Sequence, residues 1–176
     1  ARALLGLPAQ GRCVLFVGND FHKKGLPTLL AALAQLPADA FLAVVGNPAQ
    51  QVLVEDEVQA CGQRERVYFL GALSRVDAAY QAADCLAHPT LEDTFAMVVL
   101  EALSHGLPTV VSSARYCGIA AELHDGEDAL LLEDPCDTQA LAHALNRALT
   151  DTALIIQLRQ HGQVLARRHL WTQIAQ

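Results

Sequence analysis

Two bases and two acids are the residues with the clearest chemical potential. Lys23 and Lys24 are the only lysines of the chain, and they lie in the loop that follows an apolar run. Asp93 and Glu101 flank the start of a predicted helix. Cations at a helix N-terminus oppose the helix dipole, so an anionic ligand explains the lysines better than local stability does. Since a helix N-terminus also attracts phosphate, these residues predict a site for a ligand that carries phosphate and hydroxyl groups.

The stretch from His88 to Gly106 predicts a strand end, a polar turn and an apolar helix. The helix is expected to begin near Thr94, because Thr90 and Asp93 are residue types that cap helices. Glu101 would then lie two turns inside it. The alternative is structural: Asp93 is only a cap, and Glu101 pairs with an arginine such as Arg115.

Composition limits the classes of protein that fit. The chain has 176 residues, 52% of them hydrophobic, and a formal net charge of −7. This describes one compact domain and argues against a nucleic-acid partner. Five cysteines without C-x-x-C spacing, and no evident signal peptide, favour a reducing, cytoplasmic location. We expect residues 1–11 to be a linker remnant and 152–176 to be a terminal helical segment, so that 1–176 is one domain of a longer chain.

Short apolar runs alternate with helical patterns along the chain. The predicted strands are 13–18, 40–45, 66–71, 85–88, 108–112 and 129–132. The predicted helices are 25–35, 51–60, 74–83, 94–104, 118–123, 137–149 and 152–169, with Ser74 and Asp137 as caps and Trp171 just beyond the last helix. This alternation predicts an α/β fold, a doubly wound parallel sheet of about six strands with helices on both faces.

Both candidate anion-binding segments follow predicted strands. Residues 18–24 come after the first strand and residues 89–94 after the fourth. Ligands of such sheets bind beyond the carboxyl ends of the strands. We therefore expect the lysines and the acids to face the same edge. No G-x-G-x-x-G follows the first strand, which counts against a dinucleotide oxidoreductase.

Several motifs in this order resemble one enzyme family. They are Phe16-Val17-Gly18 with Lys24-Gly25, Phe69-Leu70-Gly71, His88-Pro89-Thr90 through Glu101-Ala102, Gly106-Leu107-Pro108, Cys117-Gly118 and Trp171. Over nearly the full length, the chain resembles the C-terminal, donor-binding domain of the GT-B glycosyltransferases of family 4. The Cys-Gly pair and the Lys-Gly form are most similar to the lipopolysaccharide-core glucosyltransferases.

The resemblance implies a role for each matching residue. Asp93 and Lys24 would be the catalytic pair, with Asp93 at the donor sugar and Lys24, helped by Lys23, at the diphosphate. Glu101 would accept hydrogen bonds from the ribose. The other donor-binding positions implied are Gly18, Asn19, Phe69, Leu70, Thr94, Phe95, Ala96 and Met97, the last three through backbone N–H groups.

The resemblance also implies an activity. The full-length protein would be a retaining hexosyltransferase that uses a nucleoside diphosphate sugar, a UDP-sugar first, in polysaccharide or lipopolysaccharide synthesis. No cofactor and no metal are expected. A missing N-terminal domain would bind the acceptor, so the domain alone would be inactive, and any contact with the inner membrane would come through that missing half. The alternatives are a GT-B sugar epimerase or phosphorylase, and a non-enzymatic doubly wound interaction module.

Three residues depart from the family pattern. Asp93 stands where glutamate is usual, Ala96 where many members have glycine, and Asn19 where an arginine is frequent. These departures bear on the identity of the donor sugar more than on the fold.

Overall fold

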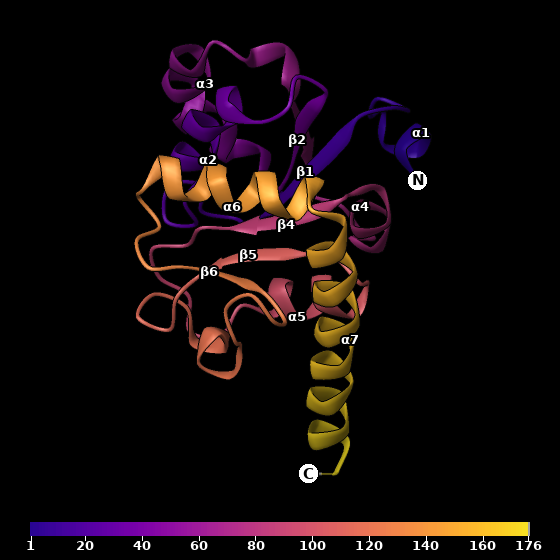
Figure 1. The fold of residues 1–176 in the computed structure, drawn as a ribbon. Coiled ribbons are helices and arrows are strands. Elements are labelled where there is room, and N and C mark those ends of the chain that lie inside the picture. Colours follow the sequence, from indigo (N-terminus) through magenta and orange to yellow (C-terminus); the bar gives the residue numbers. More distant parts are fainter. Residues whose placement is uncertain (176) are drawn as a thin grey trace.

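The computed structural model describes residues 1–175, with side chains described through residue 170. Within this range the chain forms a six-stranded sheet, all parallel, in the order β3-β2-β1-β4-β5-β6 (Figure 1). The strands are β1 (Arg12–Val17), β2 (Ala40–Val45), β3 (Val67–Gly71), β4 (Cys85–His88), β5 (Thr109–Ser112) and β6 (Leu130–Leu132). The predicted fold class is confirmed.

Helices cover both faces of the sheet. They are α1 (Arg2–Leu5), α2 (Leu26–Ala32), α3 (Glu55–Cys61), α4 (Asp77–Ala82), α5 (Met97–Ser104), α6 (Thr138–Thr150) and α7 (Thr152–Ala175). Four 3-10 segments add to them: η1 (Leu33–Gln35), η2 (Pro48–Val54), η3 (Arg64–Arg66) and η4 (Gly118–Glu122). Helices α2, α3 and α6 pack on one face, and α4 and α5 pack on the other.

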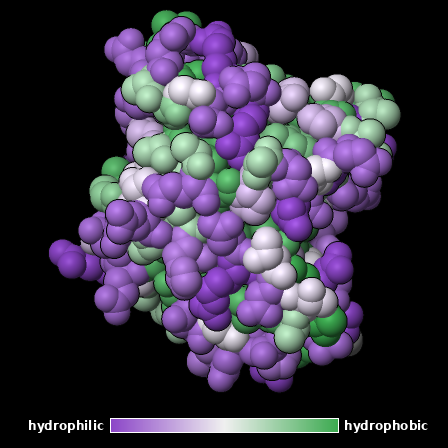
Figure 2. Space-filling model, turned by 45° about the horizontal axis from the view of Figure 1, so that its top comes forward, coloured by the Kyte–Doolittle hydropathy of each residue, from purple (hydrophilic) through white to green (hydrophobic). Residues whose placement is uncertain are grey.

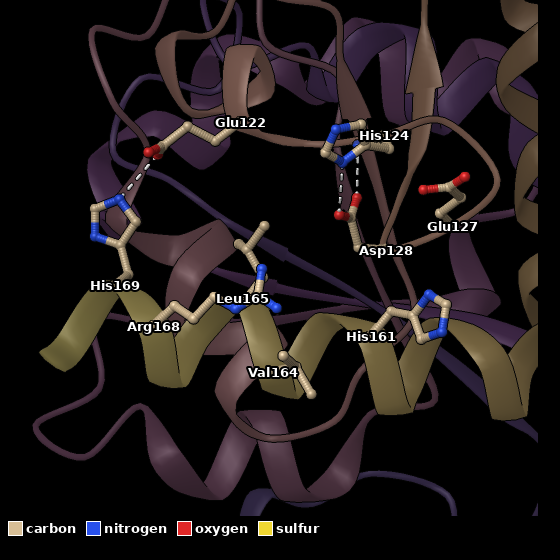
Figure 3. A pocket seen from close by; sticks show the side chains of 9 residues that line it. All are labelled: Glu122, His124, Glu127, Asp128, His161, Val164, Leu165, Arg168 and His169. Carbon is tan, nitrogen blue, oxygen red and sulfur yellow. Dashed lines mark hydrogen bonds and ion pairs between the residues drawn. The ribbon is translucent and has the colours of Figure 1, made fainter. Parts of the chain in front are cut away.

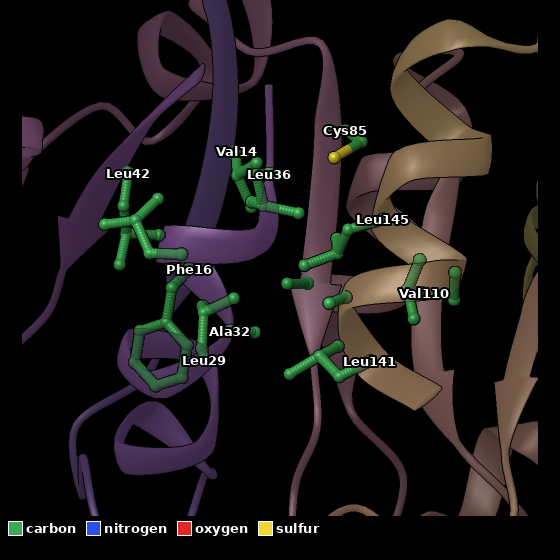
Figure 4. Close-up of a cluster of buried hydrophobic side chains, with 14 of the residues drawn as sticks. Val14, Phe16, Leu29, Ala32, Leu36, Leu42, Cys85, Val110, Leu141 and Leu145 are labelled. Carbon is green, nitrogen blue, oxygen red and sulfur yellow. The ribbon is translucent and has the colours of Figure 1, made fainter. Parts of the chain in front are cut away.

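Each central strand contributes side chains to two cores. Val14 and Phe16 of β1 belong to the cluster under α2 and α6, shown in Figure 4. Cys13 and Leu15 of the same strand belong to the opposite cluster, and all four are completely buried. Alternate residues of a strand point to opposite faces, so a strand covered on both sides must be apolar throughout. This is why the short apolar runs predicted the strands correctly.

The start of α5 differs from the prediction. The helix begins at Met97 instead of Thr94, and Glu101 lies about one turn inside it instead of two. Its N-cap is Ala96, which has a φ of 77° and makes no side-chain cap hydrogen bond. Asp93 and Thr90 therefore do not cap α5. Residues 93–96 form a separate turn that is held by other contacts, described below.

Other boundaries need smaller corrections. Helix α4 begins at Asp77 with Val76 as its N-cap, so Ser74 does not cap it. The helix predicted for 51–60 is η2 followed by α3, and 118–123 is the 3-10 segment η4. Asp137 caps α6 as predicted, accepting from Ala140 N at 3.0 Å. Helix α7 continues to Ala175, so Trp171 lies within it; its side chain is outside the described part.

The N-terminal segment is fixed to the rest of the domain by Arg2. Arg2 of α1 pairs with Asp84 at 2.9 Å and donates to Ala82 O, which ties residues 1–11 to the end of α4. The face shown in Figure 2 is mostly hydrophilic, with hydrophobic residues scattered over it. Among residues 1–175, the helices are all too short or too polar to cross a membrane.

Candidate functional site

The order of the strands reverses its direction between the neighbouring strands β1 and β4. From β1 the chain moves outward to β2 and β3, and from β4 it moves outward to β5 and β6 in the opposite direction. The loops that follow β1 and β4 therefore flank the point where the direction reverses, which is where doubly wound sheets bind ligands. Residues 18–24 and 89–94 are these two loops, so the structure confirms that they share one edge.

The two loops are in direct contact. Leu91 N donates to Lys23 O at 2.8 Å. Gly25, with a φ of 87°, lies so close to the turn after β4 that a Cβ there would approach Pro89 O to 1.9 Å. Only glycine fits such a contact, because L side chains rarely adopt this φ and no side chain has room. Gly25 thus allows the close approach of the loop 18–24, which carries the lysines, to the turn 89–94, which carries Asp93.

Lys24, in the loop after β1, reaches Asp93 in the turn after β4. Its Nζ lies 3.1 Å from Asp93 Oδ2 and 3.1 Å from Glu92 O. The side chains are 21% and 16% exposed, so the pair is mostly shielded yet open at the rim. Two segments nearly seventy residues apart in sequence are joined by this contact. A partly shielded ammonium at this edge of the sheet is placed to attract an anion.

His88 is the second partner of Asp93. At the end of β4 it is only 1% exposed, and its Nε2 lies 3.0 Å from Asp93 Oδ2. The His88 hydrogen bond, followed by the contacts with Lys24, holds the pKa of Asp93 well below its usual range. Asp93 is therefore a carboxylate at neutral pH. Its orientation is fixed from beneath by a buried imidazole, so His88 is a positioning residue for Asp93.

Backbone contacts hold the turn before α5. Asp93 N donates to Tyr116 O, and Gly118 N donates to Asp93 O. A Cβ on Gly118 would lie 1.8 Å from Thr94 O, so the segment after β5 packs directly on the turn. Asp93 Oδ1 accepts from Phe95 N at 3.3 Å. Thr94 and Met97 are exposed beside this turn, while Ala96 is buried.

Glu101 lies on the exposed side of α5 and is held by a tyrosine. Its Oε2 accepts from the Tyr80 hydroxyl of α4 at 2.8 Å. The ion pair with Arg115, considered as an alternative, is not among the contacts of the described residues, and the Arg115 guanidinium lies over the Tyr116 ring at 5.5 Å. Glu101 is thus an exposed acceptor and not half of an internal salt bridge.

The remaining predicted positions surround this centre. Lys23 is exposed and pairs with Glu92 at 3.6 Å, so its ammonium is turned to the surface. Gly18 is partly buried, and Asn19 Oδ1 accepts from Asn47 N at 3.2 Å. Phe69 and Leu70 lie in β3, two strands from β1, and their side chains pack into opposite cores.

Cys117 lies next to the acidic turn, where it forms an isolated bridge with Asp93. Burial, and then the Asp93 carboxylate, raises the pKa of the Cys117 thiol to about 11. A nucleophilic cysteine needs a depressed pKa. This thiol therefore stays protonated at neutral pH.

A separate cavity of about 600 Å³ lies between α7 and residues 122–128 (Figure 3). His169 contacts Glu122 at 2.8 Å and His124 contacts Asp128 at 3.2 Å along its sides. It is built from α7, Glu122 of η4 and residues 124–128, and its His169 packs on the Phe95 ring with 5.2 Å between ring centroids. Within the described residues, no three histidine, cysteine or acidic side chains gather as metal ligands would.

Two residues of the site were not found from the sequence. By itself the sequence shows His88 only as a histidine at a strand end, and its bond to Asp93 depends on the turn that follows it. The only signal for Tyr80 is that it is the one aromatic residue in the alanine-rich sequence segment 77–83. A lone aromatic among small residues on an amphipathic helix marks a packing position, and here the hydroxyl also reaches a polar partner.

Comparison with known proteins agrees with this architecture. Residues 2–164 match the family model described as glycosyl transferases group 1. The chain is 31% identical to the lipopolysaccharide glucosyltransferase WaaG of Escherichia coli over 153 residues, covering 85% of this chain and 40% of WaaG. The chain thus spans less than half the length of this relative.

Solved structures give the same result. Sucrose-phosphate synthase from Thermosynechococcus elongatus has a TM-score of 0.84 at 33% identity, covering 95% of this chain and 43% of the synthase. HepE from Anabaena, solved in complex with UDP-glucose, has a TM-score of 0.85 at 26% identity, covering 95% and 46%. These matches set aside the interaction module considered above. The family match extends over nearly all of the sequence, so the chain belongs to the group 1 glycosyl transferases and has the fold of one half of a GT-B enzyme.

Proposed function

We propose that residues 1–176 are the C-terminal, nucleotide-sugar-binding domain of a retaining hexosyltransferase of family 4. The donor is a nucleoside diphosphate sugar, with a UDP-sugar as the first candidate. The full-length enzyme acts on the cytoplasmic side in lipopolysaccharide or polysaccharide synthesis. The observation that carries this proposal is the contact of Lys24 with Asp93 at the point where the strand order reverses.

The chemistry follows from the placement of charges. Lys24 neutralises the diphosphate as it leaves, and the N–H groups that open α5 add their dipole at the same place. This electrostatic stabilisation needs no metal or cofactor. Asp93, ionised and oriented by His88, faces the sugar, and Glu101 accepts the ribose hydroxyls. In the unliganded chain Lys24 and Asp93 neutralise each other, so the diphosphate competes with Asp93 for the ammonium.

The likeness to HepE supports the choice of donor, since that protein was solved with UDP-glucose. The relatives are more than twice as long as this chain. We infer that a preceding domain binds the acceptor, that residues 1–11 belong to the connection, and that this domain alone transfers no sugar. Product analysis of the full-length protein distinguishes transfer from epimerisation and phosphorolysis.

Calorimetric titration with UDP, GDP and ADP tests the proposal. We expect UDP to bind and Lys24→Ala to weaken it by about 10- to 100-fold, the range for a lost hydrogen bond to a charged group. Arg12→Ala is the matched control. Arg12 is a cation at the opposite end of β1 that pairs with the exposed Asp39, so its loss leaves UDP affinity unchanged. Absence of nucleotide binding, or equal binding by the Lys24 variant, contradicts the proposal.

A further inference from the structure

The carboxylate of Glu101 is exposed, yet it has a fixed direction. A glutamate on the open side of a helix ordinarily samples several rotamers, and a ligand must pay to select one. Here Oε2 is held at 2.8 Å by the Tyr80 hydroxyl, which comes from the neighbouring helix α4. The other carboxylate oxygen, Oε1, has no such partner among the described contacts.

The Tyr80 side chain is itself buried and packed. It is 2% exposed and belongs to the core under α4 and α5. Its ring stacks on His105, with 5.0 Å between ring centroids and 26° between planes. His105 Nδ1 lies 2.9 Å from Glu101 O, and its Nε2 lies 3.6 Å from Asp77 Oδ1. Tyr80 and His105 therefore join α4 to the turn of α5 that carries Glu101.

The tyrosine proton has one preferred acceptor. A phenol donates a single hydrogen bond, and the other oxygen near it, Val98 O, is 3.4 Å away. Burial, followed by the hydrogen bond to Glu101, raises the pKa of Tyr80. The hydroxyl is therefore protonated at neutral pH, and it directs its hydrogen to Oε2.

We propose that Tyr80 is a positioning residue which fixes Glu101 so that Oε1 receives the hydroxyl pair of the donor's ribose, and that it thereby sets the preference for ribose over deoxyribose. This inference rests on the proposed function and names a residue that acts through Glu101 without touching the nucleotide. Without the Tyr80 hydroxyl, Glu101 must be ordered when the nucleotide binds. The expected loss is about three- to tenfold in affinity, the size of ordering one flexible side chain.

Two ligands separate positioning from general structural damage. We compare UDP with 2′,3′-dideoxyuridine 5′-diphosphate by calorimetry on the wild-type chain and on Tyr80→Phe, which keeps the ring. The wild type binds UDP more tightly than the dideoxy analogue. Tyr80→Phe loses about three- to tenfold for UDP and nothing for the analogue. Tyr68→Phe, whose ring packs edge-on against Phe41 in the same core, leaves both affinities unchanged.

Each other outcome has a defined meaning. Equal losses for both ligands give Tyr80 a merely structural role and overturn the inference. Unchanged UDP affinity in Tyr80→Phe, or a wild type that does not distinguish the two ligands, overturns it as well. A wild type that binds no UDP refutes the proposed function itself.

Discussion

Asp93 is the residue on which most of the local chemistry converges. Its Oδ2 is shared by Lys24 and by the buried His88, and its Oδ1 accepts from Phe95 N. The sequence pointed to Lys24 and Asp93, because a lysine pair before a helix and acids around an apolar helix are unusual residue types at such positions. It did not indicate His88 or Tyr80 as their partners, since each lies on another element and reads as an ordinary core residue.

The low pKa of Asp93 predicts a pH dependence. A carboxyl group whose pKa is lower in the folded than in the unfolded chain stabilises the fold above about pH 4, and this contribution is lost as the pH falls towards its folded pKa. We expect Asp93→Asn to melt several degrees below wild type at pH 7, since about 1 kcal/mol corresponds to roughly 2–4 °C at this size. The difference in melting temperature between the wild type and Asp93→Asn becomes smaller below pH 4.

Calorimetric melting between pH 3 and pH 8 measures this gap. Glu133→Gln, an exposed carboxyl change on the loop after β6, is the control and follows wild type throughout. A gap for Asp93→Asn that stays constant down to pH 3 shows that the His88 and Lys24 contacts do not favour the charged form.

The start of helix α5 could not be predicted from the local sequence. Its apolar pattern gave its existence and its end, but its start was placed three residues early. The turn at 93–96 is kept out of the helix by residues more than twenty positions later: Tyr116 O accepts from Asp93 N, and Ile119 N donates to Phe95 O. No local pattern contains these bonds. Residues 94–96 were expected to be helical because Thr90 and Asp93 are capping residue types. The tertiary contacts of the turn override this local preference.

The turn predicts an unusual response to one substitution. Ala96 is the one residue other than glycine with positive φ in the described chain. Ala96→Gly relieves about 1–2 kcal/mol of backbone strain. It also loses about 0.8 kcal/mol of methyl burial and gains unfolded-chain entropy worth about 0.5–1 kcal/mol. These terms cancel, so we expect the free energy of unfolding to change by less than about 0.5 kcal/mol.

The same substitution elsewhere provides the comparison. Ala140 is exposed in the first turn of α6, where Ala→Gly costs about 1 kcal/mol without any relief of strain. Urea denaturation of the two variants measures both changes. A loss at Ala96 as large as that at Ala140 would mean that the left-handed backbone at Ala96 carries no strain.

The whole molecule is organised by the reversal between β1 and β4. Apolar runs and their alternation with helices were enough to predict the parallel sheet, because strands buried on both faces leave a clear sequence pattern. The order of the strands was not contained in that pattern. It is the order that brings residues 18–25 and 89–101 together, so the site emerges only from the assembled sheet.

Amide spectra of the ¹⁵N-labelled chain, recorded with and without UDP, test the central claim most directly. The account predicts that the shifted signals belong to residues 18–25 and 93–101, on both sides of the reversal, and that residues 122–128 and 161–165 of the cavity stay unperturbed. Shifts confined to that cavity, or no shifts at saturating UDP, would contradict it.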